Sequence, residues 1–121
     1  MGTEPDFWNV IRELAHTGSL NLDRPRGSTH PHDPEMIYPL DDCYLENTSA
    51  GDGDGIDIWT GPKTDKTLTG ILCTFDRLKR DAEIKLLIGC TQEDIQTIQS
   101  FHSEMATLFI PSPLVEDDLS E

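Results

Sequence analysis

Apolar residues recur at helical spacing near both ends of the chain. The first run predicts an amphipathic helix over residues 6–15, which should end near Gly18. Its apolar face consists of Phe7, Val10, Ile11 and Leu14. The second run predicts a helix over residues 92–108, with Thr91 as its N-cap because a threonine hydroxyl accepts from free backbone N–H groups. The apolar stripe of this helix consists of Ile95, Ile98, Phe101 and Met105.

Between these helices the pattern changes to short apolar or alternating runs, which are typical of strands. The runs predict strands over residues 20–23, 37–46, 56–60, 68–75 and 82–88. A loop with three prolines should occupy residues 24–36, and a turn rich in glycine and aspartate should occupy residues 47–55. Five short strands with helices at both ends predict a small antiparallel barrel that carries the helices on its outside.

The length of 121 residues predicts a single domain over residues 1–115, followed by an acidic, disordered tail over residues 116–121. No apolar stretch is long enough to span a bilayer, and the N-terminus lacks the hydrophobic region of a signal peptide.

The three cysteines are Cys43, Cys73 and Cys90. Their odd number and the lack of a CxxC pair predict reduced thiols, so we expect a cytoplasmic protein with no membrane partner.

The chain is strongly acidic, with 23 acidic and 9 basic residues and a formal net charge of -14. Binding to a phosphate backbone needs a positive surface, so the charge argues against nucleic acid as a partner. An acidic surface is usually explained by solubility alone. Carboxylates gathered to hold cations are the other explanation.

Three aspartates lie within six residues, interleaved with glycines: Asp52, Asp54 and Asp57. Glycine permits sharp turns, so these carboxylates can converge, and oxygen ligands suit magnesium, manganese or calcium. An isolated run of this kind is more often a solvated acidic turn, because aspartate–glycine dipeptides are ordinary turn signals. A calcium EF-hand does not fit, because the twelfth position counted from Asp52 is Lys63 instead of glutamate.

A second acidic pair, Asp76 and Asp81, brackets a charged turn between two predicted strands. Strand alternation then places Asp81, Glu83 and Lys85 on one face of the second strand. Taken alone, such a pair is more often a solvated hairpin than a site.

Together the two clusters resemble a known family. The run IYPLDDCYLENTSAGDGDGIDIW resembles the signature region of the family I soluble inorganic pyrophosphatases, in which a tyrosine–proline precedes an Asp-x-Asp-x-x-Asp turn. The run GILCTFDRLKRDAEIK resembles the next hairpin of that family, with two more aspartates at this separation. Upstream, Asp23-Arg24-Pro25 and Gly27-Ser28 resemble a further family motif. The resemblance covers residues 20–105.

This resemblance implies an α+β fold, a five-stranded OB-like barrel with flanking helices. It implies magnesium, with manganese as an alternative, bound by Asp52, Asp54, Asp57, Asp76 and Asp81. The metal would activate a water for hydrolysis of pyrophosphate to phosphate. Asp57, Asp54 and Tyr38 would be catalytic, although a tyrosine whose hydroxyl simply reaches the surface explains Tyr38 nearly as well. Arg24, Lys85, Arg26 and Lys79 would bind the phosphates, and the family's oligomers imply a homo-oligomer.

The chain also departs from the family at positions that hold phosphate. A tyrosine of the strand motif is replaced by Asp42, and the lysine two residues beyond the last metal aspartate is replaced by Glu83. Met105 and Ala106 stand where the C-terminal helix of the family has a tyrosine and a lysine, and the loop over residues 26–37 is short. These changes leave the substrate open.

Two alternatives to a pyrophosphatase therefore remain. One is a hydrolase of the same fold that acts on another phosphoanhydride, of the nucleotide type. The other is a non-catalytic module that binds a divalent metal. His30 and His32 flank Pro31 in the predicted loop, but a loop histidine is more often a surface residue than a metal ligand.

Overall fold

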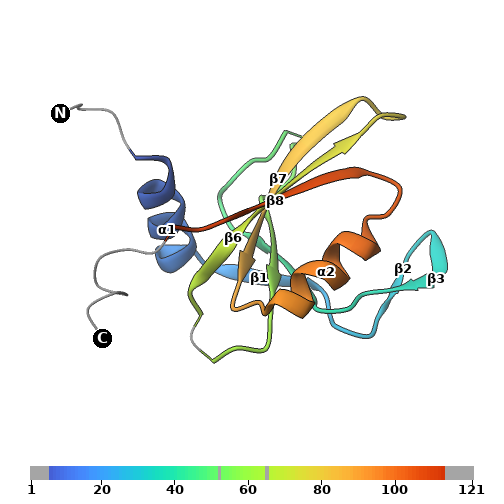
Figure 1. Ribbon diagram of the computed structural model, residues 1–121, viewed down its shortest axis with the longest axis horizontal. Helices are drawn as coiled ribbons and strands as arrows, with labels where there is room; N and C mark the ends of the chain where they lie inside the picture. The colour runs from blue at the N-terminus through green and yellow to red at the C-terminus, as the bar shows by residue number, and fades with distance from the viewer. Residues whose placement is uncertain (1–5, 52, 65, 114–121) are drawn as a thin grey trace.

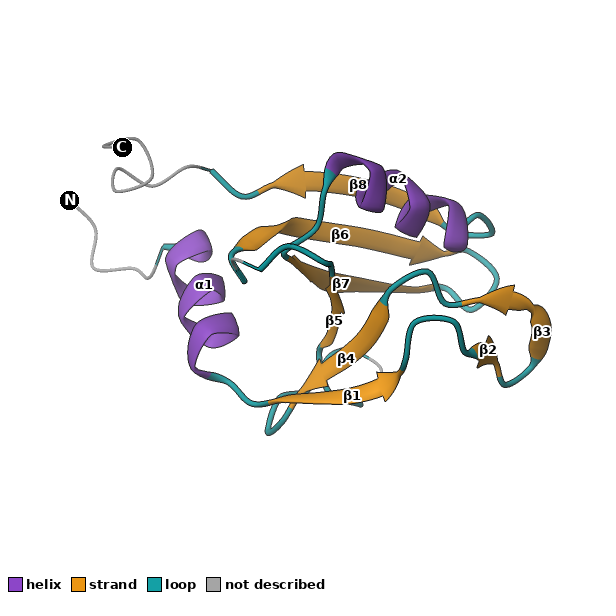
Figure 2. Ribbon diagram, turned by 90° about the horizontal axis from the view of Figure 1, so that it is seen from below, coloured by secondary structure: helices purple, strands orange, loops and turns teal. Residues whose placement is uncertain are grey.

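The computed structural model describes residues 6–51, 53–64 and 66–113. The elements in chain order are α1 (Phe7–Thr17), β1 (Leu20–Arg24), β2 (Thr29–His30), β3 (Asp33–Ile37), β4 (Asp41–Leu45), β5 (Asp57–Thr60), β6 (Leu68–Asp76), β7 (Asp81–Ile88), α2 (Gln92–Phe101) and β8 (Ala106–Pro111). In both ribbon views α1 and the β2–β3 hairpin lie at opposite ends of the molecule (Figure 1, Figure 2). The predicted tail over residues 116–121 lies outside the described residues.

The larger of the two described sheets has six strands in the order β1-β4-β5-β7-β6-β8. Its neighbouring strands are antiparallel except for β5 and β7, which run parallel, with Ile58 opposite Leu86 and Thr60 opposite Ile88. The second sheet is the two-stranded hairpin of β2 and β3. The sheet is therefore mixed, with β1 and β8 as its edges.

The prediction of a closed, five-stranded antiparallel OB-like barrel is wrong. The described part of the chain forms an open sheet of six strands with one parallel pair. The added strand is β8, which pairs with β6 over Ala106–Pro111 and includes the last three residues of the helix predicted over residues 92–108. The two strands at the ends of the sheet order are not paired with each other.

The second helix is shorter than predicted because the apolar pattern changes period after residue 101. The helix begins at the predicted N-cap, Thr91, whose side chain accepts from the backbone N–H of Asp94. It ends at His102, which donates its backbone N–H to Ile98. Beyond it, side chains alternate along β8 as a strand requires, with Leu108 opposite Cys73 and Ile110 opposite Ile71.

Two further differences concern the segment before β4. The predicted loop over residues 24–36 contains the β2–β3 hairpin, and the predicted strand over residues 37–46 is divided at residues 38–40. Pro39 has no backbone donor, which disfavours a continuous ladder here. Tyr38 instead bonds across the turn, receiving from Gly27 N–H and donating its own N–H to Ser28. The first helix and the strands predicted over residues 20–23, 56–60, 68–75 and 82–88 are confirmed to within two residues.

The two helices cover opposite faces of the sheet. Against α1 packs an apolar cluster made of Cys43, Leu45, Ile58, Ile71, Leu86 and Ile88. In a second cluster, Ile95 and Ile98 of α2 pack with Tyr38, Leu40, Trp59, Leu72, Leu87 and Cys90. The face under α2 is apolar at one end only, and its other end carries the charged residues described next.

Candidate functional site

Strand register places three charged residues from three strands on the face under α2. Asp42 of β4 lies opposite Trp59 of β5, so the two side chains share a face. Asp57 precedes Trp59 by two residues and therefore lies on that face too. Lys85 precedes Leu87 by two residues on β7, and Leu87 is the partner of Trp59. Asp42, Asp57 and Lys85 thus project from neighbouring strands on one side of the sheet.

Lys85 is the centre of this cluster. Its Nζ donates to Asp57 Oδ2 over 2.8 Å and lies 3.5 Å from Glu83 Oε1. The Lys85 side chain is 11% exposed, which is low for a lysine and explains why it has two carboxylate partners. Burial acts to lower the pKa of Lys85, but Asp57 and Glu83 more than offset burial, so this pKa is raised. Lys85 therefore stays protonated.

Asp42 is the titratable member of the cluster. Burial raises the pKa of Asp42 to about 7, and the negative charges of Asp57 and Asp23 act in the same direction. Lys85 and Arg24 oppose the rise but do not cancel it. At this end of the face, carboxylates outnumber cations, so one carboxyl group binds a proton near neutral pH.

Tyr38 borders the cluster from the turn before β4. Its ring is 7% exposed and packs against Phe101 and Trp59, with ring centroids 4.9 and 6.0 Å away. Burial and then the charge of Asp42 raise the pKa of Tyr38, which therefore stays a hydrogen-bond donor at neutral pH.

His102 lies just beyond α2 and contacts the same aromatic group. Burial, with a smaller effect of Lys85, lowers the pKa of His102 to about 4, so the imidazole is neutral. Within the described residues, its Nε2 and Trp59 Nε1 are buried side-chain atoms without a hydrogen-bond partner. The ring centroids of Trp59 and His102 are 5.9 Å apart. Sequence reasoning missed His102, because nothing in its neighbourhood on the chain indicates that it packs near Lys85.

The four predicted metal ligands that the structure describes, Asp54, Asp57, Asp76 and Asp81, do not form a group arranged to hold a metal ion. Asp52 lies outside the described residues. Asp57 is bound by Lys85, and Asp76 accepts the backbone N–H groups of Leu78 and Lys79 in the β6–β7 turn. Asp81 lies opposite Asp76 at the start of β7, four residues from Lys85, or about 13 Å along a strand.

Asp54 lies in the turn before β5, where its carbonyl oxygen accepts from Ala50 N–H. Over residues 6–51, 53–64 and 66–113 no group of three or more His, Cys, Asp or Glu side chains is arranged to hold a metal ion. The described residues do not fit the resident magnesium site that the resemblance implies.

The four predicted phosphate-binding residues also separate into two groups. Arg24 lies opposite Asp42 across β1 and β4, and its charge acts on both Asp42 and Tyr38. Lys85 is at the centre of the cluster. Arg26 and Lys79 lie in exposed turns away from it, where their backbone N–H groups are held by Asp41 and Asp76.

The predicted loop histidines belong to the aromatic group beside the cluster. The His30 ring stacks on Tyr38 with centroids 6.2 Å apart, and His30 Nδ1 accepts from His32 N–H. His30, Asp76 and His102 line a cavity of about 520 Å³ between the β2–β3 hairpin and the end of α2. His30 therefore packs against Tyr38 and lines this cavity. The described residues around it form no group of metal ligands.

Asp42 is the residue that sequence reasoning noticed but did not place in the site. It appeared only as the loss of a family tyrosine, although burial raises its pKa to about 7. A charged residue in a run that otherwise alternates as a strand was the available signal. The signal could not reveal that Asp57 and Lys85 lie beside it.

Comparison with known proteins adds no relative: no family model, curated protein or solved structure matches the chain. The similarity to the family I pyrophosphatases thus rests on the motifs alone. None of the helices in the described residues has the length and apolar character needed to cross a membrane.

Proposed function

We propose that this protein hydrolyses a phosphoanhydride, with inorganic pyrophosphate as the first substrate to test, at the cluster around Lys85. The observation that carries the proposal is a convergence in space. Tyr38 and Asp57 come from one motif of the sequence and Lys85 from another, and the three lie together around Asp42. Arg24, from a third motif, adds a second cation.

Asp42 supplies the proton acceptor in this proposal. A general base works best when its pKa lies near the working pH, and the pKa of Asp42 is about 7. A water would attack one phosphorus, its proton would pass to Asp42, and the bond to the bridging oxygen would break to release phosphate. Lys85 and Arg24 would bind the phosphate oxygens through charge-assisted hydrogen bonds, so they would contribute mainly to substrate binding.

Magnesium, with manganese as the alternative, enters this proposal as part of the substrate. Pyrophosphate at neutral pH is an anion that binds divalent cations, and the described residues form no metal centre of their own. A metal–pyrophosphate complex also reduces the repulsion between the substrate and a chain of net charge -14. Activity should therefore depend on magnesium even though the folded chain holds no preformed site among its described residues.

The test is phosphate release from a panel of pyrophosphate, nucleotides and sugar nucleotides, with and without magnesium. Release from pyrophosphate that requires both magnesium and Asp42 supports the proposal, with Asp42→Asn as the variant. Glu46→Gln, an exposed residue just after β4, is the matched control and should keep full activity. If the parent protein releases phosphate from no member of the panel, the proposal is wrong. Magnesium binding without hydrolysis would then favour the non-catalytic metal module.

Two context proposals accompany this function. We propose a cytoplasmic protein, supported by three free cysteines of which Cys43 and Cys90 are buried. We also propose a homo-oligomer, because Phe75, Ile84 and Leu108 are each about half exposed on neighbouring strands. Trp59 is 2% exposed, so its side chain is too buried to form part of such an interface. Sedimentation velocity across a range of concentrations tests self-association.

A further inference from the structure

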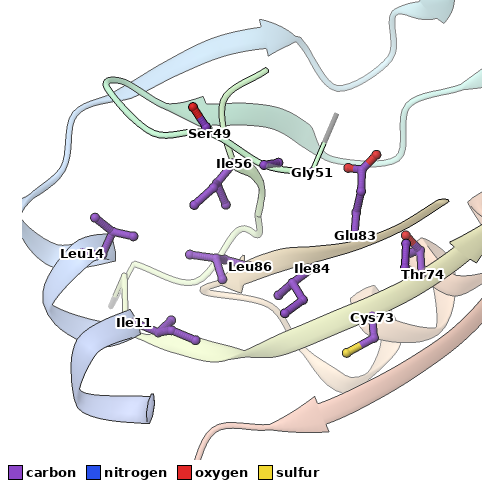
Figure 3. A pocket seen from close by; sticks show the side chains of 12 residues that line it. Ile11, Leu14, Ser49, Gly51, Ile56, Cys73, Thr74, Glu83, Ile84 and Leu86 are labelled. Atoms are coloured by element: carbon purple, nitrogen blue, oxygen red, sulfur yellow. The ribbon is translucent and has the colours of Figure 1, made fainter. Parts of the chain in front are cut away.

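A second cavity, of about 590 Å³, lies on the other face of the sheet, between α1, the loop at residues 49–51 and strands β6 and β7. Six apolar side chains line most of it: Ile11, Leu14, Ile56, Cys73, Ile84 and Leu86. Figure 3 shows these side chains gathered around an open space, with α1 on one side. A volume of this size is typical of small-molecule sites, which lie commonly in the range of about 300–1,000 Å³.

The end of this cavity opposite α1 is polar and adjoins the cluster around Lys85. Glu83 and Thr74 lie there (Figure 3), and Glu83 is also the second carboxylate beside Lys85, at 3.5 Å. Glu83 can border both the cavity and the cluster around Lys85 because β7 extends beyond the point where its pairing with β5 begins. The register pairs β5 with β7 only from Leu86 onward, and before that point the loop at Gly51 runs beside Ala82.

We propose that this cavity holds the apolar organic group of an organic diphosphate whose phosphates are bound at the cluster around Lys85. This inference rests on the proposed function and narrows its substrate class. In the reaction, water would attack the terminal phosphorus, the bond from that phosphorus to the bridging oxygen would break, and the products would be an organic monophosphate, inorganic phosphate and a proton.

The chemistry of the lining favours an apolar group over a nucleoside or a sugar. The walls nearest α1 are hydrocarbon side chains, so a base or a hydroxylated ring would bury polar atoms without partners. An alkyl or prenyl chain has no such cost. Each methylene that leaves water for the cavity should improve binding about fourfold.

The first experiment measures kcat/KM for phosphate release from methyl, butyl and octyl diphosphate, with pyrophosphate as the internal reference. We expect kcat/KM to rise with chain length by about fourfold for each buried methylene, until the cavity is full. Equal values for methyl and octyl diphosphate, in a protein that hydrolyses pyrophosphate, would overturn the inference and leave the proposed function standing.

Variants then show whether the cavity causes the length dependence. Cys73 points into the cavity (Figure 3), so Cys73→Phe should reduce the octyl-to-methyl ratio of kcat/KM by tenfold or more and leave pyrophosphate hydrolysis unchanged. Leu78→Phe is the matched control, because Leu78 is 88% exposed in the β6–β7 turn. An unchanged ratio in folded Cys73→Phe contradicts the inference. If that variant does not fold, Ala82→Leu, also in the lining, replaces it with the same expectation.

Calorimetry of octyl and methyl diphosphate binding distinguishes two outcomes: that the proposed hydrolysis is wrong, and that the proposed binding in the cavity is wrong. If nothing is hydrolysed but octyl diphosphate binds more tightly than methyl diphosphate, and Cys73→Phe removes the difference, the cavity assignment stands and the proposed hydrolysis is wrong. If neither compound binds nor reacts, both are wrong.

Discussion

Lys85 and Asp57 meet across the single parallel strand pair of the described sheet, with Lys85 Nζ 2.8 Å from Asp57 Oδ2. Asp57 is 30% exposed whereas Lys85 is 11% exposed, so the cation is the more deeply buried partner. The pair joins two segments that are 28 residues apart in the sequence. It therefore ties the stability of the sheet to the arrangement of the candidate site.

Replacing Asp57 with asparagine should affect both stability and turnover. The variant keeps the shape but leaves a buried ammonium group with Glu83 as its remaining ion-pair partner, which should cost about 2 kcal/mol of unfolding free energy. Urea unfolding measures this cost. If the proposed hydrolysis is correct, turnover should also fall by about a hundredfold. Lys85→Ala should instead mainly raise KM, and full magnesium-dependent activity in Asp57→Asn would contradict the assignment of Asp57 to the site.

Asp42 should make stability depend on pH in an unusual direction for an aspartate. The pKa of Asp42 is about 7 in the folded protein, against 3.8 for an unperturbed aspartate. Between these values the folded state binds more protons than the unfolded state. The contribution of Asp42 is thus fully present below pH 4 and is lost as the pH rises through 7, by about 4 kcal/mol.

Urea unfolding of the parent protein and of Asp42→Asn at pH 5, 6, 7 and 8 isolates this contribution. Asparagine cannot ionise, so the variant should gain stability relative to the parent as the pH rises. A constant difference between the two proteins at all four values would show that the pKa of Asp42 is not raised. If Asp42 is also the general base, the kcat/KM of the parent should rise with pH and level off above pH 7.

Magnesium alone should change the thermal stability little. The described residues form no group of three or more metal ligands, so the ion has no preformed site among them. Magnesium together with imidodiphosphate, a pyrophosphate analogue that resists hydrolysis, should raise the melting temperature because the complex binds the folded state. A large shift with magnesium alone, removed by Asp57→Asn, would instead support a resident metal site that includes Asp57.

Gly70 should be intolerant of any side chain. A Cβ at this position would meet the backbone oxygen of Ile110 and the ring of Phe109, at the point where β6 pairs with β8. Gly70→Ala should therefore separate the end of β8 from the sheet and lower the unfolding free energy by about 2 kcal/mol or more. Gly51→Ala is the control, because its Cβ would make only an ordinary 3.5 Å contact with Ala82. Equal stability of the two variants would contradict the close β6–β8 contact.

The elements that the sequence predicts well are those whose pattern has a local cause. The N-cap at Thr91 and the alternation over residues 82–88 depend on neighbouring residues, and both are confirmed. The strand β8, by contrast, does not have a purely local cause. Leu108 continues the helical spacing of Phe101 and Met105 but also alternates with Ile110 as in a strand, and pairing with β6 selects the strand.

The candidate site also has one part that the sequence predicts and one part that depends on pairing between distant strands. Asp57 and Lys85 were identifiable one by one, but the face that joins them depends on the parallel register of β5 and β7, which no local pattern encodes. The sequence leaves the role of Asp76 open for a related reason. An aspartate before a charged turn can bind a metal or cap the turn, and in the structure it accepts two backbone N–H groups of the turn.

The parallel pairing of β5 with β7 also has a consequence for how the molecule folds. β6 and β7 can form early as a hairpin, since Asp76 and Asp81 are only five residues apart and pair at its end. β5 can join β7 only after the intervening chain has closed a long loop, and such non-local pairings slow folding. The contact between Asp57 and Lys85 should thus be among the last to form, so the candidate site is completed only when the whole sheet has assembled.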